Sequence, residues 1–260
     1  MKKAPLTVIV GLCTAAVLGV WAAPAGAQSA EVKEKPQMYS YVAYWAIPRA
    51  RWAEMDKAVA ADQKILDKGI AAGTLVAYGD DTTLIHQAEG FTHDNWWSSM
   101  SMAGLLNTLD EIYKSGTATS PVLGAATKHE DSMLVSRYYN WHAGSWKGAY
   151  VHTALYKLKP TAPDDALDTI AKTLIVPMYE KLLAAGTILE YEVDEEAIHT
   201  ASPDNFSVTY FTATAEGQDK VAAAVREAFK ANPLAGPATG AMFDYTAHRD
   251  YLARANVVFK

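Results

Sequence analysis

The sequence predicts an α+β fold built by tandem duplication, with two antiparallel sheets facing each other within one chain. Three observations lead to this prediction. Residues 68–78 (KGIAAGTLVAY) recur as residues 181–191 (KLLAAGTILEY), and six of the eleven positions are identical. An aromatic, β-branched run that ends at a proline, Pro48 or Pro160, precedes each copy. The strand and helix patterns then follow the order β-α-β-β-α-β in both halves.

The first strand of each half is expected where the aromatic and β-branched residues gather. These runs are residues 38–47 (MYSYVAYWAI) and 149–158 (AYVHTALYKL). We align Tyr44 with Tyr156, because each lies four residues before the proline that ends its run.

An amphipathic helix is predicted next in each half, over residues 52–72 and 167–185. Their apolar residues are mostly three or four apart, which places them on one face. Pro177 predicts a kink in the second of these helices. Gly73 and Gly186 are the expected C-terminal caps, where a left-handed backbone is needed.

A long strand is predicted after each cap, over residues 74–86 and 187–199. The centre of each is acidic, with Asp80 and Asp81 in the first and residues 194–196 (DEE) in the second. A solvated bulge or bend is the favoured interpretation, because neighbouring strand residues point to opposite faces. A catalytic carboxylate pair is the alternative.

A third strand, a second helix and a last strand complete each half. They are predicted at residues 97–102, 104–114 and from His129 onward in the first half, and at residues 207–214, 216–231 and from His248 onward in the second. Asp94-Asn95-Trp96 is aligned with Asp204-Asn205-Phe206 ahead of the third strands.

This order predicts a pseudo-twofold barrel inside one polypeptide. A four-stranded sheet with helices on one face leaves the other face bare, and two copies can cover each other. The expected organisation is a signal peptide at residues 1–27, a flexible lead at 28–37, a first repeat at 38–140, a linker at 141–147 and a second repeat at 148–260.

A family resemblance is carried by Tyr156-Lys-Leu-Lys-Pro160, which closes a strand before an amphipathic helix. This pattern resembles the opening of dimeric α/β-barrel proteins of the stress-responsive A/B-barrel type, whose unit is ferredoxin-like. The first half departs from it, with Tyr44-Trp-Ala-Ile-Pro48. The resemblance implies a barrel over residues 38–260. The superfamily includes cofactor-free monooxygenases, lactone isomerases, haem peroxidases, chlorite-degrading enzymes and members without known activity.

The N-terminus has the layout of a secretory signal peptide. Lys2 and Lys3 precede an apolar run over residues 6–23, and Ala25-Gly26-Ala27 is a small-residue cleavage site. We expect a secreted or periplasmic protein that is cleaved near Ala27. A retained membrane anchor is the alternative, because the apolar run lies at the lower limit for a spanning helix.

Composition limits the chemistry and the partners. The single cysteine, Cys13, leaves with the signal peptide, so we expect no disulfide and no thiolate chemistry. The loss of Lys2 and Lys3 changes the net charge from −6 to −8. Nucleic acid and anionic membranes are therefore poor partners. We expect a small-molecule ligand and a monomer or weak homo-oligomer.

Two histidines recur at matching positions in the two halves. His86 and His199 each follow an isoleucine at the end of the acidic strand. With Tyr44 and Tyr156 they are the predicted catalytic acid–base residues. The alternative is structural, since a histidine beside a turn often hydrogen-bonds the backbone.

A second recurring pattern is His-x-Asp at the start of each last strand, His129 with Asp131 and His248 with Asp250. Residues two apart on a strand point to the same face, so each pair could form an oriented base. Together the two pairs could form a metal site. Capping of the last strand is the favoured interpretation, and no metal is expected.

Aromatic residues supply the predicted binding surface. Trp45, Trp96, Trp97 and Phe206 could contact a planar ligand, or they could simply fill the barrel. Haem would need an axial histidine and usually a distal arginine, and no such arrangement is recognisable. We therefore expect no cofactor.

The sequence leaves the activity undecided. It favours a secreted α/β barrel that binds or transforms a small apolar or aromatic molecule through His and Tyr acid–base chemistry, as a cofactor-free monooxygenase or isomerase would. The alternatives are a non-catalytic ligand carrier or structural envelope protein, and then a haem-binding barrel.

Overall fold

The computed structural model describes residue 32 and residues 34–88, 90–200 and 204–260, which belong to one compact unit. The predicted signal peptide lies outside the described residues. In the described part of the chain, no helix is both long enough and apolar enough to cross a membrane.

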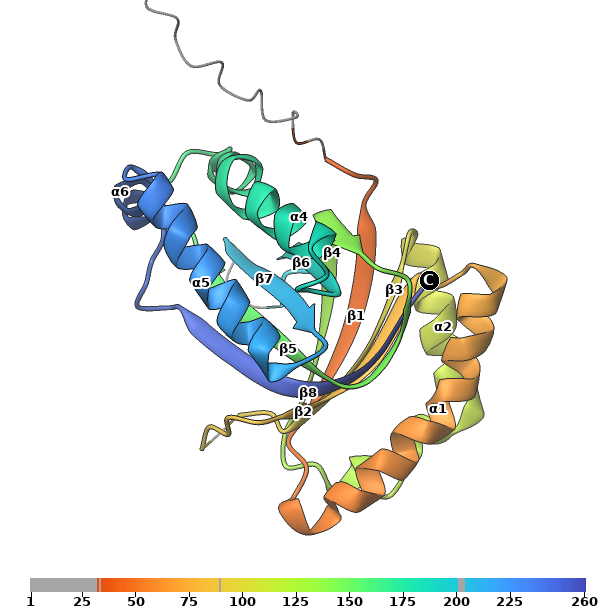
Figure 1. Ribbon diagram of the computed structural model, residues 1–260. Coiled ribbons are helices and arrows are strands. Elements are labelled where there is room, and N and C mark those ends of the chain that lie inside the picture. Colours follow the sequence, from red (N-terminus) through yellow and green to blue (C-terminus); the bar gives the residue numbers. More distant parts are fainter. Residues whose placement is uncertain (1–31, 33, 89, 201–203) are drawn as a thin grey trace, which may run out of the picture. The chain divides into compact units, whose positions relative to one another are not determined.

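Eight antiparallel strands form a closed barrel in an α+β fold (Figure 1). The strands are β1 (Met38–Trp45), β2 (Ala77–Thr83), β3 (His93–Ser99), β4 (His129–Trp141), β5 (Gly144–Lys157), β6 (Glu190–Glu196), β7 (Asn205–Thr212) and β8 (Arg249–Phe259). Their order around the barrel is β1-β3-β2-β8-β5-β7-β6-β4.

The two halves of the chain arrange their strands in the same way. The first half has the order β4-β1-β3-β2 and the second has β8-β5-β7-β6. Strand β2 pairs with β8, and β4 pairs with β6, so each half closes the open edges of the other. The barrel therefore closes within a single chain, as predicted, and leaves no free strand edge.

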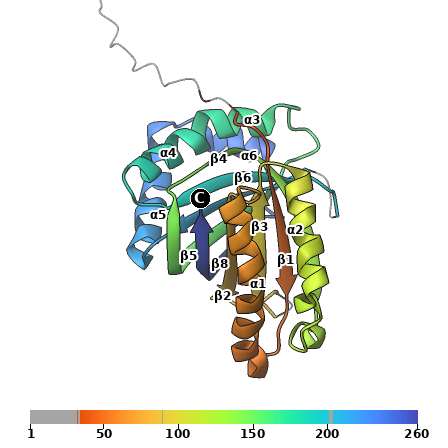
Figure 2. The ribbon, with the colours of Figure 1, turned by 90° about the vertical axis from the view of Figure 1, so that its right-hand side faces the viewer.

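Helices cover the outer face of the barrel (Figures 1 and 2). The α-helices are α1 (Trp52–Ala72), α2 (Met102–Ser115), α3 (Ala166–Ile170), α4 (Val176–Ala184), α5 (Ala215–Ala231) and α6 (Ala235–Met242). Helices α1 and α2 pack on strands of the first half, α5 packs on β7 of the second, and α4 packs across β4 and β6, where the two halves meet. Their buried stripes form hydrophobic cores against the outward side chains of the strands.

The first-half helices lie close to where the periodicity places them. Helix α1 has the predicted bounds, and its cap Gly73 has a φ of 76°. The predicted acidic strands are shorter than expected, because residues 84–86 and 197–199 lie beyond the ends of β2 and β6. The predicted linker, residues 141–147, is mostly strand, and only His142 and Ala143 separate β4 from β5.

The second-half helices depart more from the prediction. The helix expected at residues 167–185 is interrupted by a π-helical turn, Ala171–Ile175, which ends two residues before Pro177. This turn supplies the predicted irregularity, because proline cannot donate the regular backbone hydrogen bond. Helix α6 was not predicted, since its Gly- and Pro-containing sequence resembles a connector.

Register corrects the alignment of Tyr44 with Tyr156. Tyr44 pairs with Asp94, whereas the residue at the same register position in the second half is Leu155, which pairs with Ser207. Tyr156 instead packs among the helix-facing residues. A slip of one residue moves a strand side chain to the other face of its sheet.

Strand register also corrects the predicted alignment of Asp94-Asn95-Trp96 with Asp204-Asn205-Phe206. Asp81 lies opposite Asp94, and Asp194 lies opposite Ser207. Asp94 therefore corresponds to Ser207, not to Asp204. Trp96 consequently points into the barrel while Phe206 packs in the helix-facing core.

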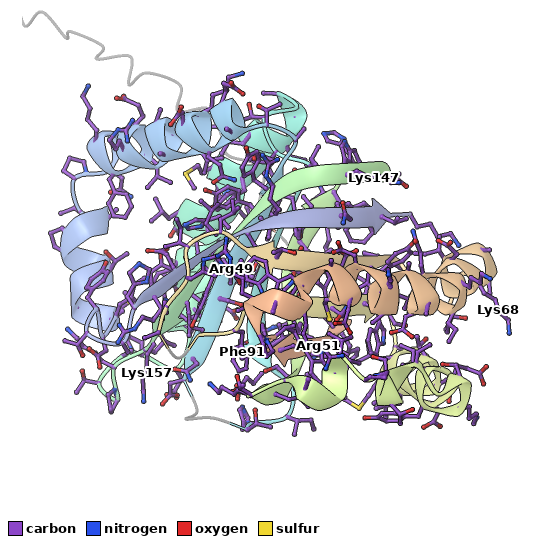
Figure 3. All side chains as sticks on the ribbon, turned by 90° about the horizontal axis from the view of Figure 1, so that it is seen from below. Arg49, Arg51, Lys68, Phe91, Lys147 and Lys157 are labelled. Atoms are coloured by element: carbon purple, nitrogen blue, oxygen red, sulfur yellow. The ribbon has the colours of Figure 1, made fainter. Side chains whose placement is uncertain are left out.

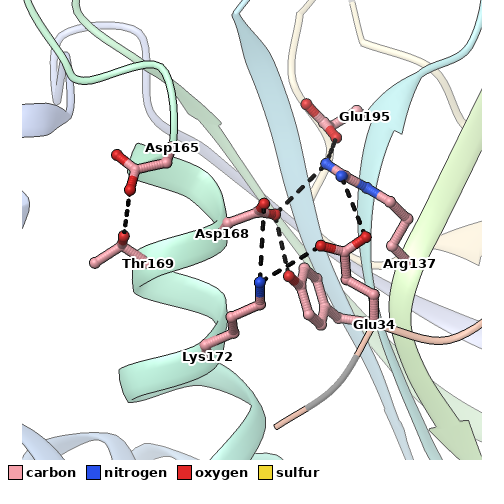
Figure 4. Close-up of polar contacts among 8 residues, drawn as sticks. Glu34, Arg137, Asp165, Asp168, Thr169, Lys172 and Glu195 are labelled. Carbon is pink, nitrogen blue, oxygen red and sulfur yellow. Dashed lines mark hydrogen bonds and ion pairs between the residues drawn. The ribbon is translucent and has the colours of Figure 1, made fainter.

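The predicted flexible lead is held by the barrel where it is described. Glu34 forms ion pairs with Arg137 at 3.6 Å and with Lys172 at 3.4 Å (Figure 4). Arg137 also pairs with Asp168 at 3.6 Å and with Glu195 at 2.8 Å. These contacts tie residues near the start of the described chain to β4, β6 and the helical segment after β5.

The interior of the barrel has two parts. One end is filled by an apolar cluster that includes Trp96, Phe211, Val257 and Phe259. The other end holds a cavity, described below. Phe91, which is labelled in Figure 3, is one of the residues that line this cavity.

Candidate functional site in the barrel interior

The barrel encloses a cavity of about 260 Å³. This is close to the lower limit of about 300 Å³ for small-molecule sites. Alternation along each strand decides its lining, since every second side chain points inward. Charged and polar residues supply much of the wall: Ser40, Asp81, Asp94, Glu130, Ser132, Thr153, Glu192, Asp194, Glu195, Glu196, Asn205, Ser207 and Thr209.

Asp81 and Asp94 form a carboxyl pair on one wall of the cavity. They are directly opposite each other on β2 and β3, and Asp81 is only 7% exposed. Burial and then the neighbouring Asp94 raise the pKa of Asp81 well above its usual value. Burial raises the pKa of Asp94 to about 7. Because two adjacent buried carboxylates repel each other, we expect the pair to hold one proton near neutral pH.

Asp194 occupies the corresponding position in the second half, halfway around the barrel. It is 1% exposed and accepts hydrogen bonds from Ser136 and Ser207. Burial raises its pKa to about 7, and the two serine hydroxyls oppose that rise. Ser136 lies directly opposite Asp194 in the pairing of β4 with β6, just before a bulge in β4, and this pairing gives Asp194 its partner.

Tyr44 connects the two acidic walls electrostatically. It lies on β1 in the lining of the cavity, beside the ring of Phe91 at 5.3 Å. Burial raises its pKa well above the usual value, and the charges of Asp94 and Asp194 add to the rise. Tyr44 is therefore a neutral hydroxyl that can donate a hydrogen bond at neutral pH.

The predicted catalytic histidines do not reach the cavity. His86 and His199 are exposed, follow the ends of β2 and β6, and are absent from the cavity lining. A general base must reach its substrate, so these two histidines are not part of the site formed by the cavity. Among the predicted acid–base residues, Tyr44 alone lines the cavity.

The two His-x-Asp pairs form as predicted but remain apart. His129 Nε2 is 3.4 Å from Asp131 and His248 Nε2 is 3.2 Å from Asp250. The first pair lies at the start of β4 and the second at the entrance to β8, and these strands are not neighbours in the barrel. The proposed joint metal site is therefore not assembled. No group of three or more His, Cys, Asp or Glu side chains in the described residues is arranged to hold a metal.

Each pair instead packs at the start of its strand. His129 Nδ1 is 2.9 Å from the carbonyl oxygen of Tyr44, and its ring stacks on Trp45. His248 Nδ1 is 2.9 Å from the carbonyl oxygen of Leu155, and its ring stacks on Tyr156. This geometry supports the capping interpretation.

The predicted aromatic binding residues divide between two faces. Trp96 lines the cavity, and Phe206 reaches its edge from the helix-facing core. Trp45 and Trp97 pack outward against the helices. Trp97 stacks on Tyr41 with a centroid distance of 4.5 Å, so its role there is packing.

The acidic residues at the centres of β2 and β6, and not the recurring histidines, supply side chains to the cavity. The prediction of solvated bulges is wrong for Asp81 and Asp194, which are buried and point inward. Asp80 and Glu195 point to the other face of their strands, toward Asn256 and Arg137 respectively. Alternation along a strand places neighbouring acidic residues on opposite faces. Only the register between paired strands shows which of them points into the barrel.

The described cavity lining does not fit haem. It contains no histidine, cysteine or methionine to serve as an axial ligand, and the Tyr44 hydroxyl, whose pKa is raised by burial, is held in its protonated form rather than as a ligating phenolate. It also contains no lysine or arginine to pair with the haem carboxylates. No reaction step is therefore assigned to this group.

Comparisons with solved structures support the fold. The chain resembles a monooxygenase candidate from Lactobacillus acidophilus, with a TM-score of 0.61 and 10% identity, over 86% of this chain and 97% of the other. It also resembles a monooxygenase candidate from Fusobacterium nucleatum, with a TM-score of 0.59 and 5% identity, over 86% and 94%. An anthrone oxidase-like protein has a TM-score of 0.52 and 12% identity, over 87% and 94%.

At such low identity these similarities show a shared barrel architecture and no more. No protein-family profile matches the sequence, and no curated protein matches it.

Proposed function

We propose that the barrel is a small-molecule enzyme in which the Asp81–Asp94 pair transfers a proton to or from a ring-bearing ligand without a bound cofactor. One observation carries this proposal: the buried carboxyl of Asp81 and the half-buried carboxyl of Asp94 face each other in the wall of the barrel cavity. A carboxyl whose pKa lies near 7 can act as a base or as an acid at neutral pH.

The chemistry of the wall supports this role. Tyr44 stays protonated and can donate a hydrogen bond to an oxygen of the ligand, which would stabilise negative charge left by proton removal. Trp96 and Phe211 supply aromatic surface in the same cavity. Two structural neighbours described as monooxygenase candidates favour a reaction in which the deprotonated ligand meets O₂. An isomerase would use the same proton transfer without O₂.

The test uses the full chain and a panel of one- to three-ring compounds that carry a phenolic hydroxyl or a CH₂ group next to a carbonyl. Trp fluorescence and calorimetry measure binding. An oxygen electrode and incorporation of solvent deuterium measure chemistry. We expect at least one compound to bind and react, and Asp94→Asn to lower its rate about 100-fold. His86→Gln is the matched control, because its side chain lies outside the cavity.

The outcomes separate the alternatives. Binding without oxygen uptake or deuterium incorporation would support a ligand carrier and contradict the enzyme proposal. Failure of the whole panel to bind would contradict a small-molecule site in the barrel.

We also propose that the two halves arose by duplication and that the protein is secreted. The first proposal is supported by the shared strand order and by the matching packing of His129 on Trp45 and His248 on Tyr156. The second rests on the sequence pattern of residues 1–27. Mass spectrometry of the mature N-terminus after export would test it, and an uncleaved chain would contradict it.

A further inference from the structure

The charged residues that line the cavity are all acidic. Seven acidic residues border it, and no lysine, arginine or histidine does so among the described residues. They are Asp81, Asp94, Glu130, Glu192, Asp194, Glu195 and Glu196, of which Glu195 directs its carboxyl to Arg137 on the outer face. Glu195 is neutralised from outside by Arg137, but a carboxyl pair inside the barrel has no such partner. Burying carboxyl groups together is unfavourable unless something opposite in charge joins them.

An oxygen of the Asp81 carboxyl has no hydrogen-bond partner. Asp81 is 7% exposed, lines the cavity, and its Oδ1 atom is buried without a donor in the described structure. Buried polar atoms nearly always have a partner. The Asp81 carboxyl also interacts with Asp94 and Trp96, and the acceptor that stays open at Oδ1 points to a donor that a ligand brings.

Glu190 extends this pattern toward the filled end of the barrel. It is 2% exposed, and neither of its carboxyl oxygens has a hydrogen-bond partner in the described structure. It shares a small void with Glu192, and Glu192 also lines the main cavity. The three inward carboxyls of β6 thus run from this void to Asp194.

The carboxyls lie on opposite walls. Asp81 is on β2 and Asp194 is on β6, and four strand positions separate these strands in an eight-stranded barrel. The charges of Asp81 and Asp194 both act on Tyr44, which places it within electrostatic reach of each wall. The described residues contain no compact group of ligating side chains that could hold a metal. Dispersed carboxyls suit a larger cation that spans the space between them.

Aromatic side chains give the cavity a second feature that suits an organic cation. Trp96, Phe211 and Tyr44 line the same cavity as the acids. Aromatic faces attract organic cations, and they also pack against ligand rings.

We propose that the cavity binds an organic cation, a ring-bearing amine whose ammonium group pairs with the buried carboxyls and whose ring packs on the aromatic wall. This inference rests on the proposed function of the barrel as a small-molecule site and names the ligand class. Asp81 and Asp94 receive the ammonium group on one wall, and Asp194 with Glu192 balances charge on the other.

Binding of such a cation should release protons. The pKa values of Asp94 and Asp194 are raised by burial to about 7, so both are partly protonated near pH 7. A nearby positive charge lowers the pKa of a carboxyl, and the protons then leave to the buffer. Calorimetry in buffers of different ionisation enthalpy measures this release directly.

The experiment compares three probes that share a 4-hydroxyphenyl ring and differ in charge. Tyramine is cationic, tyrosol is neutral and 4-hydroxyphenylacetate is anionic. With the full chain at pH 7, we expect tyramine to bind at least ten times more tightly than tyrosol and to release protons. We expect no measurable binding of 4-hydroxyphenylacetate.

Variants test where the cation binds. Asp81→Asn and Asp194→Asn should each weaken tyramine at least fivefold and leave tyrosol unchanged, whereas Asp110→Asn, on the exposed surface of α2, should change neither. Circular dichroism and the thermal midpoint identify a variant that fails to fold, and the other variant then decides the question.

Two outcomes would overturn the inference without touching the proposed function. The first is an affinity for tyrosol equal to that for tyramine, with both competing for one site. The second is binding of tyramine without any loss in either Asp variant. If tyramine fails to bind while neutral compounds of the larger panel do bind, the cation inference is wrong and the small-molecule site stands. Failure of all compounds contradicts both.

Discussion

Asp81 on β2 lies directly opposite Asp94 on β3, and both carboxyls belong to the wall of the internal cavity. The corresponding pair in the second half is Asp194 and Ser207. The serine donates a hydrogen bond to the carboxyl, whereas an aspartate in its place must share or lose a proton. The second half therefore stabilises its buried carboxylate by a hydrogen bond. In the first half two neighbouring carboxyl groups repel each other when both are ionised.

The first prediction concerns pH. The pKa values of Asp94 and Asp194 are raised by burial to about 7, so the folded chain holds protons that the unfolded chain has lost. Stability is therefore present at low pH and falls as pH rises through 7. Between pH 6.5 and 8.5 we expect a loss of about 1 kcal/mol for each such group in the free energy of unfolding.

Urea denaturation across this range measures the loss. Burial lowers the pKa of His93 to about 4, so this residue makes stability rise with pH. That rise falls mainly below pH 6.5 and therefore does not mask the loss measured here. Asp94→Asn should flatten the profile, and Asp110→Asn should keep the slope of the wild type. An equal slope in Asp94→Asn and the wild type would contradict the placement of the titration.

The second prediction concerns Ser136. Its hydroxyl donates to the buried carboxyl of Asp194, so Ser136→Ala should destabilise the fold by about 1–3 kcal/mol at pH 8. The loss should shrink at pH 5.5, where Asp194 is protonated in both proteins. Ser132→Ala, on the same strand and in the same cavity lining, is the control and should cost much less. Equal losses at the two positions would show that the hydrogen bond is unimportant.

The third prediction concerns Gly79. A Cβ atom at this position would lie 2.6 Å from the ring of Trp96 and 2.9 Å from the backbone oxygen of Asn256. Gly79→Ala should therefore lower stability by about 2 kcal/mol or more and shift the fluorescence of Trp96. Thermal unfolding and emission spectra measure the two effects. Gly124→Ala has open space around the new methyl and should change neither; a neutral Gly79→Ala would refute the close contact.

The fourth prediction concerns Arg137, which joins the start of the described chain to β6. Arg137→Ala removes the ion pairs with Glu34 and Glu195. Because the pairs are partly exposed, we expect a global loss of about 1 kcal/mol or less. Local effects should be larger: hydrogen exchange and protease cleavage around residues 34–37 should increase several-fold. Lys230→Ala, which removes an exposed pair on α5, should leave that segment unchanged, and unchanged protection in Arg137→Ala would contradict the anchoring role.

The sequence by itself determined the order of the elements and several of their ends. The spacing of apolar residues predicted helix α1 with its observed bounds, and Gly73 marked its cap. The His-x-Asp patterns marked the beginnings of the last strands and correctly placed each pair on one face. These features depend on local periodicity and backbone conformation, which a short segment of sequence carries within itself.

Tertiary structure decided which side chains reach the interior. Both faces of the strands are rich in aromatic residues, since one faces helices and the other faces the opposite wall, so alternation alone could not show the inside. Cross-strand register placed Tyr44 inward and Tyr156 outward. It also brought Asp81 and Asp94, thirteen positions apart in the chain, into one carboxyl pair. The candidate site is acidic rather than histidine-based because pairing between strands, which no local pattern encodes, sets the direction of every side chain.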